Sequence, residues 1–121
     1  MTNKEIVFKF YDEVFNNWDL SHIDNYMKDN YIQHNPTCED GKAGFLSFAD
    51  HFLAMKPHMD IVRIGEDNDM VYVFFKCTLE NGMVNKVCDI YRLENGLLAE
   101  HWDVVEHDVG NITPRHANGL F

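Results

Sequence analysis

Ionisable side chains cluster in one short strand-like segment, AEHWDV, at residues 99–104. It carries Glu100, His101 and Asp103, and a further acid, Asp89, interrupts the preceding strand-like segment. Charged groups are costly to bury unless they are paired or used, and aspartate disfavours β-structure. Buried acids with one charged partner often mark functional sites. The chemistry that this set favours is general acid–base catalysis.

Each candidate has a catalytic role and a structural alternative. We expect Asp89 to act as a general base that takes a proton next to a carbonyl group, with apolar neighbours tuning it for that task. Its alternative role is a structural hydrogen bond to His101 or Tyr91. His101 would fix the protonation of Asp89 or donate to an enolate oxygen, unless it is simply satisfied by the acid. Asp103 would orient a histidine or position a water, or else lie at a rim.

The pairing of the last two strand-like segments decides whether these groups meet. Both hairpin connections have the sequence LENG, at residues 79–82 and 93–96. At the second, a two-residue Asn-Gly turn would place Asp89 opposite Trp102 and scatter the ionisable groups over both faces. A three-residue Glu-Asn-Gly loop would place Asp89 opposite His101. We favour the three-residue loop because it groups the polar residues on one face.

In that register the two faces of the sheet differ in character. One face is apolar around the ionisable groups, and its predicted substrate-contacting residues are Tyr91, Phe75, Val87 and Val73. The other face is amphipathic, and we expect it to form a homodimer interface because a large surface of this kind needs cover. Its large side chains are Trp102, Ile90, Phe74 and Tyr72.

A single domain over residues 1–121 accounts for the rest of the pattern. The spacing of apolar residues predicts helices at 3–17, near 22–28 and at 43–56, with a loop between the second and the third. From 58 to 106, four segments rich in Val, Ile, Tyr and Phe predict a long antiparallel meander. Residues 107–121 are expected to form a polar C-terminal tail. These elements indicate an α+β fold.

Composition excludes several classes of protein. The net charge of -10 argues against binding to nucleic acid or to anionic membrane surfaces. The odd cysteine count, with Cys38, Cys77 and Cys88, gives neither a disulfide framework nor a zinc pattern. The N-terminal segment lacks a signal-peptide pattern, and a cytoplasmic location is therefore expected by default.

Two segments in this arrangement resemble a known family. YIQHNP follows the second predicted helix, and DIYRLENGLLAEHWDV spans the last hairpin. With three helices before a meander, the chain from about residue 3 to 106 resembles the SnoaL-like polyketide cyclases of the nuclear transport factor 2-like superfamily. The resemblance implies a cone-shaped curved sheet wrapped around the helices, with a pocket where they meet.

The resemblance also implies a chemistry. In the cyclases an acid and a histidine in the pocket promote an intramolecular aldol condensation without a metal or an organic cofactor. The matching positions here are Asp89, His101 and Asp103 in the last two strands and His34 in the loop after the second helix. The superfamily also contains isomerases, epoxide hydrolases, dehydratases and proteins without known activity, so the fold alone does not decide the reaction.

Three functions compete on these residues. The first is a small cofactor-free enzyme that performs aldol cyclisation, isomerisation or dehydration on a hydrophobic carbonyl compound. The second is a non-catalytic module that binds a small molecule or forms a dimeric interaction surface. The third is a metal site formed by His34, His101 and a carboxylate. We expect no metal, because strand neighbours of like parity are far apart for one ion.

Overall fold

The computed structural model describes residues 1–121 and is built on one five-stranded sheet. The strands lie in the order β1-β5-β4-β3-β2. Four of them form the predicted antiparallel meander, namely β2 (His58–Asp67), β3 (Met70–Thr78), β4 (Val84–Glu94) and β5 (Leu97–Glu106). β1 (Met27–Gln33) pairs with β5 in parallel, so the sheet is mixed.

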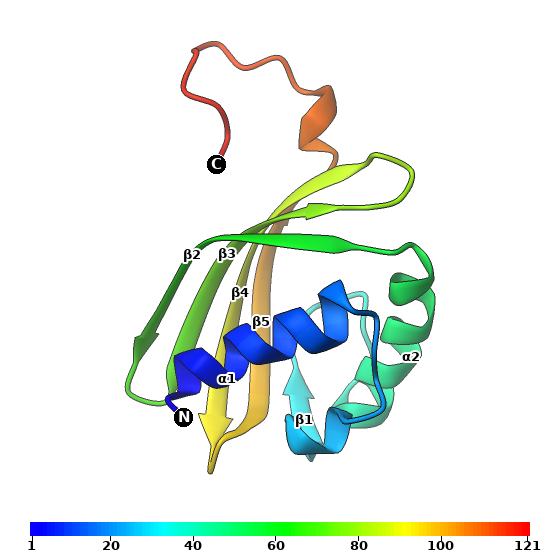
Figure 1. Cartoon of the computed structure of the whole chain (residues 1–121), viewed down its shortest axis with the longest axis vertical. Coiled ribbons are helices and arrows are strands. Elements are labelled where there is room, and N and C mark those ends of the chain that lie inside the picture. Colours follow the sequence, from blue (N-terminus) through cyan, green and yellow to red (C-terminus); the bar gives the residue numbers. More distant parts are fainter.

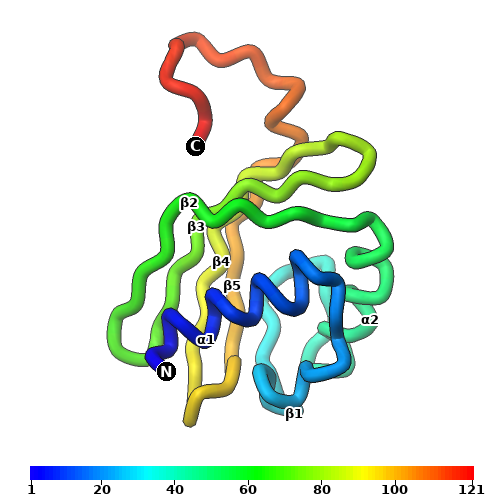
Figure 2. Tube along the Cα trace, in the orientation of Figure 1, coloured from blue at the N-terminus to red at the C-terminus, as the bar shows by residue number.

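Two helical segments cover one face of this sheet. α1 (Asn3–Phe10) continues directly into a π-helical segment, η1 (Tyr11–Asn16), and together they cross in front of the sheet (Figure 1). The hydroxyl of Thr2 accepts a hydrogen bond from Glu5 N at 3.1 Å and caps this helix. α2 (Gly41–Ala54) lies beside β1, as the trace in Figure 2 shows. The predicted α+β fold with a curved sheet around helices is confirmed.

The core lies between these helices and the sheet. The residues of α1 and η1 that pack into it are Val7, Phe10, Tyr11, Val14 and Phe15. From the sheet side the core receives Val71, Val73, Phe75, Val87, Tyr91 and Leu93, all at alternate positions of β3 and β4. This alternation confirms which face of the meander is buried.

The predicted helix near 22–28 is wrong in its second half. The structure has a short 3₁₀ turn, η2 (Ile23–Asn25), after which the chain enters β1. The first part of the segment that was expected as a loop, residues 29–33, is therefore strand. Its polar composition hid it, because β1 is an edge strand that buries Met27 and Tyr31 but exposes most of the residues between them.

The first LENG forms the predicted three-residue loop. Leu79 N donates to Met83 O at 2.9 Å, and Gly82 takes the left-handed conformation with φ +89. Val73 then lies opposite Asp89, and Phe75 lies opposite Val87, as predicted.

The second LENG differs from the prediction. Asn95 and Gly96 have φ 50 and 77 and form a two-residue turn that pairs Glu94 with Leu97. A bulge between the pairs Leu93–Leu98 and Arg92–Glu100 shifts the register of β5 by one residue. This shift returns the side chains of β5 to the faces on which they were predicted. The predicted faces are therefore correct, but the predicted partner of Asp89 is not, since Asp89 lies opposite Asp103 and His101 lies opposite Tyr91.

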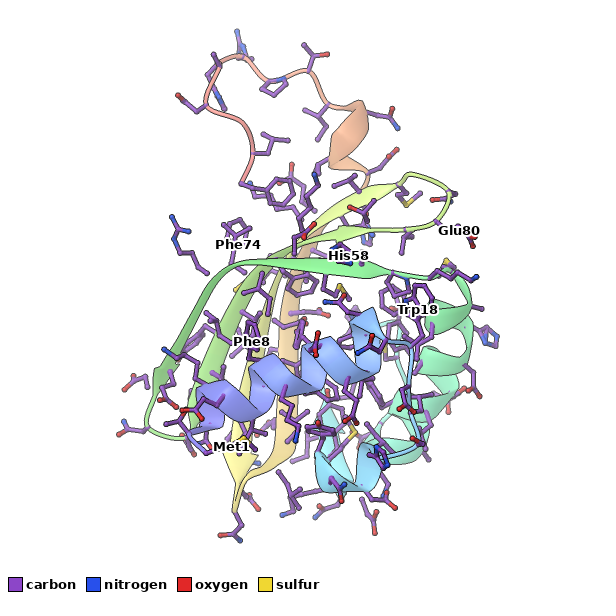
Figure 3. All side chains as sticks on the ribbon, viewed as in Figure 1. Met1, Phe8, Trp18, His58, Phe74 and Glu80 are labelled. Atoms are coloured by element: carbon purple, nitrogen blue, oxygen red, sulfur yellow. The ribbon has the colours of Figure 1, made fainter.

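The C-terminal segment leaves the end of β5 through the short turn η3 (Val109–Asn111) and extends beyond the sheet (Figure 1). It returns to the outer face of the sheet, where the ring of Phe121 stacks on Phe74 with centroids 6.1 Å apart. Phe74 is labelled in Figure 3. None of the helices is long and apolar enough to cross a membrane.

A close backbone approach in α2 gives a test of this packing. A Cβ atom on Gly44 would lie 2.1 Å from Glu39 O, whereas a Cβ on Gly65 in β2 would meet nothing within 4 Å. We expect Gly44→Ala to lower the free energy of unfolding by about 1–3 kcal/mol because the overpacked backbone must shift. Gly65→Ala is the matched control. Denaturant titration of both variants checks this, and equal losses would contradict the contact.

Candidate active site

Asp89 is buried in the middle of β4 and is held by three side chains. It is 6% exposed, and its Oδ2 accepts a hydrogen bond from the Tyr11 hydroxyl. The Tyr91 hydroxyl also reaches Oδ2, at 3.3 Å, and His101 Nε2 lies 3.0 Å from Oδ1. The predicted contact between Asp89 and His101 is therefore present, although it is diagonal rather than directly cross-strand.

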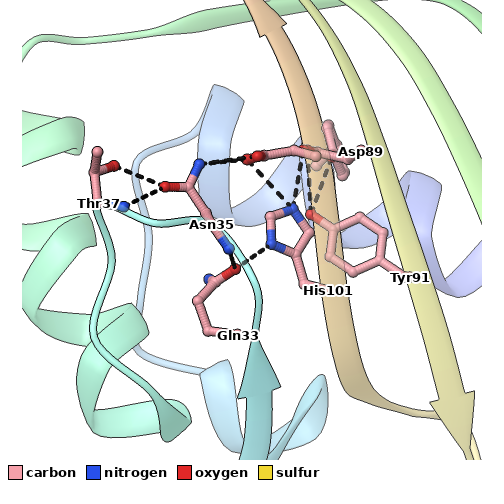
Figure 4. Close-up of polar contacts among 8 residues, drawn as sticks. Gln33, Asn35, Thr37, Asp89, Tyr91 and His101 are labelled. Atoms are coloured by element: carbon pink, nitrogen blue, oxygen red, sulfur yellow. Dashed lines mark hydrogen bonds and ion pairs between the residues drawn. The ribbon is translucent and has the colours of Figure 1, made fainter.

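The hydrogen bonds of Gln33 fix the tautomer of His101. Gln33 Oε1 accepts the backbone N–H of Asn35 at 2.9 Å and also lies 2.7 Å from His101 Nδ1 (Figure 4). Because a backbone N–H can only donate, the amide atom that it contacts must be the oxygen. An oxygen facing His101 in turn requires a proton on Nδ1. His101 Nε2 and the Asp89 carboxylate are left to share one further proton.

Asp103 is oriented by the same loop. Asn35 Oδ1 accepts from Thr37 N at 2.8 Å, which turns the amide nitrogen of Asn35 towards the carboxylate. Asn35 Nδ2 lies 2.9 Å and 2.8 Å from the two oxygens of Asp103. Asp103 Oδ2 is 3.8 Å from His101 Nε2, so the two side chains face each other in the site.

The two tyrosines act as donors to this carboxylate. The pKa of Tyr11 is raised well above its ordinary value by burial first, and then by the charge of Asp89 and by Tyr91. The pKa of Tyr91 is raised by burial and by Asp89 in the same way. Both hydroxyls therefore keep their protons at neutral pH and stabilise a negative charge on Asp89.

A cavity of about 180 Å³ opens onto these groups. Asp89, His101 and Asp103 line it together, and so do three of the four predicted substrate-contacting residues, Phe75, Val87 and Tyr91. The fourth, Val73, does not reach the cavity, since it is fully buried in the core. Exposed residues at the rim include Thr37, Phe48 and His107.

His34 does not join the site. Its ring stacks on Trp102 with centroids 4.8 Å apart, and its Nε2 lies 2.7 Å from Glu100 Oε2. Both partners are on the outer face of β5. The reason is that β1 runs through Gln33, and strand alternation turns Gln33 inward and its neighbour outward.

The sequence matches the family model of the SnoaL-like domain over residues 7–101. The chain belongs to the SnoaL-like family. No match was found among the curated proteins.

Solved structures with the fold of this SnoaL-like chain include putative polyketide cyclases. One from Acidithiobacillus ferrooxidans is 20% identical, with a TM-score of 0.77 over 86% of this chain and 87% of its own. IdmH from Streptomyces antibioticus is 16% identical, with a TM-score of 0.75 over 88% and 93%. An LEH-like epoxide hydrolase from M. tuberculosis is also 16% identical, with a TM-score of 0.72 over 86% and 82%. Identities this low establish the shared fold and leave the reaction open.

Sequence reasoning missed three members of the site. Tyr11 falls within the predicted helix at 3–17, and because a buried tyrosine hydroxyl needs a polar partner, it offered a usable signal. Gln33 and Asn35 were placed in a loop of unknown path. Only the parallel pairing of β1 with β5 brings them to His101 and Asp103, and the spacing of these residues in the sequence does not predict that pairing.

Asp89, His101 and Asp103 could each offer one ligand atom to a metal ion, and these atoms lie within 4.8 Å of one another. The expectation that like-parity strand neighbours are too far apart was therefore wrong. The ligand set suggested from the sequence is not assembled either, because His34 lies on the other face. Each of the three groups has a protein partner that accounts for its orientation, so the geometry does not require an ion.

The role of Gln33 can be tested by removing its acceptor. Gln33→Leu leaves the Nδ1–H of His101 and the N–H of Asn35 without a partner, which should lower the free energy of unfolding by about 1–3 kcal/mol. Asn30→Leu, at an exposed position of the same strand, is the matched control. Denaturant titration compares the two, and an equal effect of both substitutions would show that Gln33 Oε1 does not hold these donors.

Stability should also fall at alkaline pH. Burial, followed by Asp89, raises the pKa of Cys77 from 9.0 to about 12, and burial raises the pKa of Tyr11 above 10.0. When the pH exceeds the ordinary pKa values of cysteine and tyrosine, the unfolded chain releases protons that the folded chain keeps. The free energy of unfolding therefore decreases as the pH rises. Tyr11→Phe should make this decrease shallower in denaturant titrations, and Tyr72→Phe on the exposed face should not. Identical slopes for both would contradict the buried position of the Tyr11 hydroxyl.

Proposed function

We propose that this SnoaL-like chain is a cofactor-independent enzyme that acts by acid–base chemistry on a hydrophobic small molecule with a carbonyl group. The observation that carries the proposal is the direct contact of Asp89 Oδ1 with His101 Nε2 at 3.0 Å, on the wall of a cavity lined with aromatic side chains. The family and the fold shared with putative polyketide cyclases support it.

The central step is the formation of an enol. The Asp89 carboxylate takes a proton from the carbon next to the carbonyl, and the electron pair of that C–H bond moves into the enolate. His101 gives its Nε2 proton to the developing enolate oxygen. The proton shared by the pair thus ends on the substrate oxygen while Asp89 keeps the proton from carbon. Because Nδ1–H is bound to Gln33, Nε2 is the only nitrogen that can exchange protons with the substrate.

The enol has three possible fates. Attack on a second carbonyl of the same molecule forms a carbon–carbon bond and closes a ring, while Asp89 gives its proton to the new alkoxide and His101 Nε2 takes back the enol proton as the first carbonyl re-forms. Return of the proton from Asp89 to a different carbon moves a double bond. Loss of a β-hydroxyl, which Asp89 can protonate, releases water. The substrate decides among aldol cyclisation, isomerisation and dehydration, because the same two groups serve all three.

The surrounding residues keep the pair in a reactive state. Tyr11 and Tyr91 donate hydrogen bonds to Oδ2 of Asp89, and the Asp103 carboxylate faces Nε2 of His101 at 3.8 Å. The first step neutralises the carboxylate of Asp89 and the imidazolium of His101, and each of these two groups has polar partners of its own. The competing function, a module that binds a small molecule without chemistry, predicts binding without proton exchange.

Proton exchange tests the enzyme without knowledge of the natural substrate. In D₂O, wild-type protein should speed the exchange of the methyl protons of acetophenone, as followed by NMR. Asp89→Asn keeps the shape of the side chain but removes the base, and should slow catalysed exchange by at least about a hundredfold.

His34→Gln is the matched control and should exchange at the wild-type rate, since His34 lies on the outer face. Circular dichroism checks that each variant is folded. Undiminished exchange in Asp89→Asn rules out the role of this residue, and binding of acetophenone without exchange by the wild type favours the non-catalytic module.

The outer face of the sheet is our proposed homodimer interface. Tyr72 is 40% exposed and Val104 is 69% exposed, and the neighbouring side chains of Phe74, Ile90 and Trp102 are partly exposed. An apolar surface of this kind is commonly covered by a second subunit.

We expect a dimer in light scattering at micromolar concentration, and Val104→Asp should shift it towards monomer by placing a charge in the interface. Met55→Asp, at an exposed apolar residue at the end of α2, is the control and should remain dimeric. A monomeric wild-type protein contradicts the proposal.

A further inference from the structure

We propose that the cavity takes a neutral substrate whose enclosed part is a single ring, and that it excludes fused polycyclic molecules and anions. The requirement for a carbonyl rests on the proposed function. The limits on size and charge follow from the cavity itself.

The volume of the cavity sets the size limit. It measures about 180 Å³. An apolar protein cavity of about 150 Å³ holds one benzene molecule, and pockets for drug-sized ligands begin at roughly 300 Å³. The cavity therefore has room for one ring with a short substituent, and a fused second or third ring would have to displace protein atoms.

The aromatic wall of the cavity prevents easy widening. The ring of Phe15 packs edge-to-face against Tyr11, with centroids 5.1 Å apart, and against Phe52 at 6.0 Å. Phe52 in turn stacks on Phe48 at 5.0 Å. This row of rings leads from the tyrosine that holds Asp89 to the exposed rim. Because the inner members belong to the buried core, enlarging the cavity would require η1 and α2 to separate.

The charges that face the cavity set the second limit. Its lining contains the carboxyl groups of Asp89 and Asp103 and no lysine or arginine. When Asp89 and His101 share one proton, their charges cancel and that of Asp103 remains. A carboxylate or phosphate on the substrate would meet this negative charge at short range in a lining without lysine or arginine, whereas a neutral carbonyl compound brings no charge to be repelled.

The inference is tested by measuring the affinity of the wild-type protein for two ketones of different size and one carboxylate. Acetophenone is neutral with one ring, benzoate has similar size but is an anion, and 9-fluorenone is a neutral fused tricyclic ketone. We expect acetophenone to bind at least about tenfold more tightly than either of the other two, as measured by calorimetry or NMR titration. Tighter binding of 9-fluorenone or of benzoate overturns the inference, and so does the absence of acetophenone binding.

Enlarging the cavity provides the second arm. Phe52→Ala should raise the affinity for 9-fluorenone by about tenfold or more, and Phe48→Ala at the exposed rim serves the same purpose if Phe52→Ala fails to fold. Phe8→Ala is the matched control, because Phe8 on α1 is 55% exposed and does not line the cavity. An unchanged affinity for 9-fluorenone in both enlarged variants contradicts the size limit.

These outcomes separate the inference from the proposed function. Acetophenone that binds but does not exchange its protons removes the enzyme and leaves the size and charge limits standing. Proton exchange in acetophenone together with binding of 9-fluorenone at least as tight as that of acetophenone removes the size limit and leaves the enzyme standing.

Discussion

A carboxyl group buried in the middle of a sheet must be surrounded by hydrogen-bond donors, and the fold is organised around supplying them to Asp89. The donors come from three elements: Tyr11 from η1, which is far from Asp89 in the sequence, Tyr91 from β4 itself and His101 from β5. An uncompensated buried charge costs several kcal/mol. The contact between helix and sheet is therefore polar at this point, although apolar residues surround it.

The loop after β1 extends this network and determines which proton can move. Its backbone N–H groups fix the side-chain amides of Gln33 and Asn35, and these amides in turn orient His101 and Asp103. A short, exposed loop can thus set the protonation state of a buried histidine, because each hydrogen bond leaves only one choice for the next. The proposed chemistry depends on this order, since it leaves Nε2 as the reactive nitrogen.

The sequence predicted the parts of the fold that depend on local pattern. The alternation of apolar residues gave the buried faces of β3 and β4, and LENG at residues 79–82 gave the register of their pairing. The prediction failed for the non-local pairing of β1, which is too polar to read as a strand, and for the bulge beside Glu100, which has no sequence signature of its own. The site followed the same division. Asp89 and His101 stood out as costly residues in strands, whereas Gln33 and Asn35 are ordinary loop residues until β1 is placed beside β5.

The proton on His101 Nδ1 is the central claim, and ¹⁵N NMR of protein labelled at histidine measures it directly. The His101 signals are assigned by their loss in His101→Gln. We predict that the neutral imidazole of His101 carries its proton on Nδ1, where it is donated to Gln33 Oε1. A neutral imidazole with its proton on Nε2 and none on Nδ1 would contradict the account, because Gln33 Oε1 could then accept no hydrogen bond from His101.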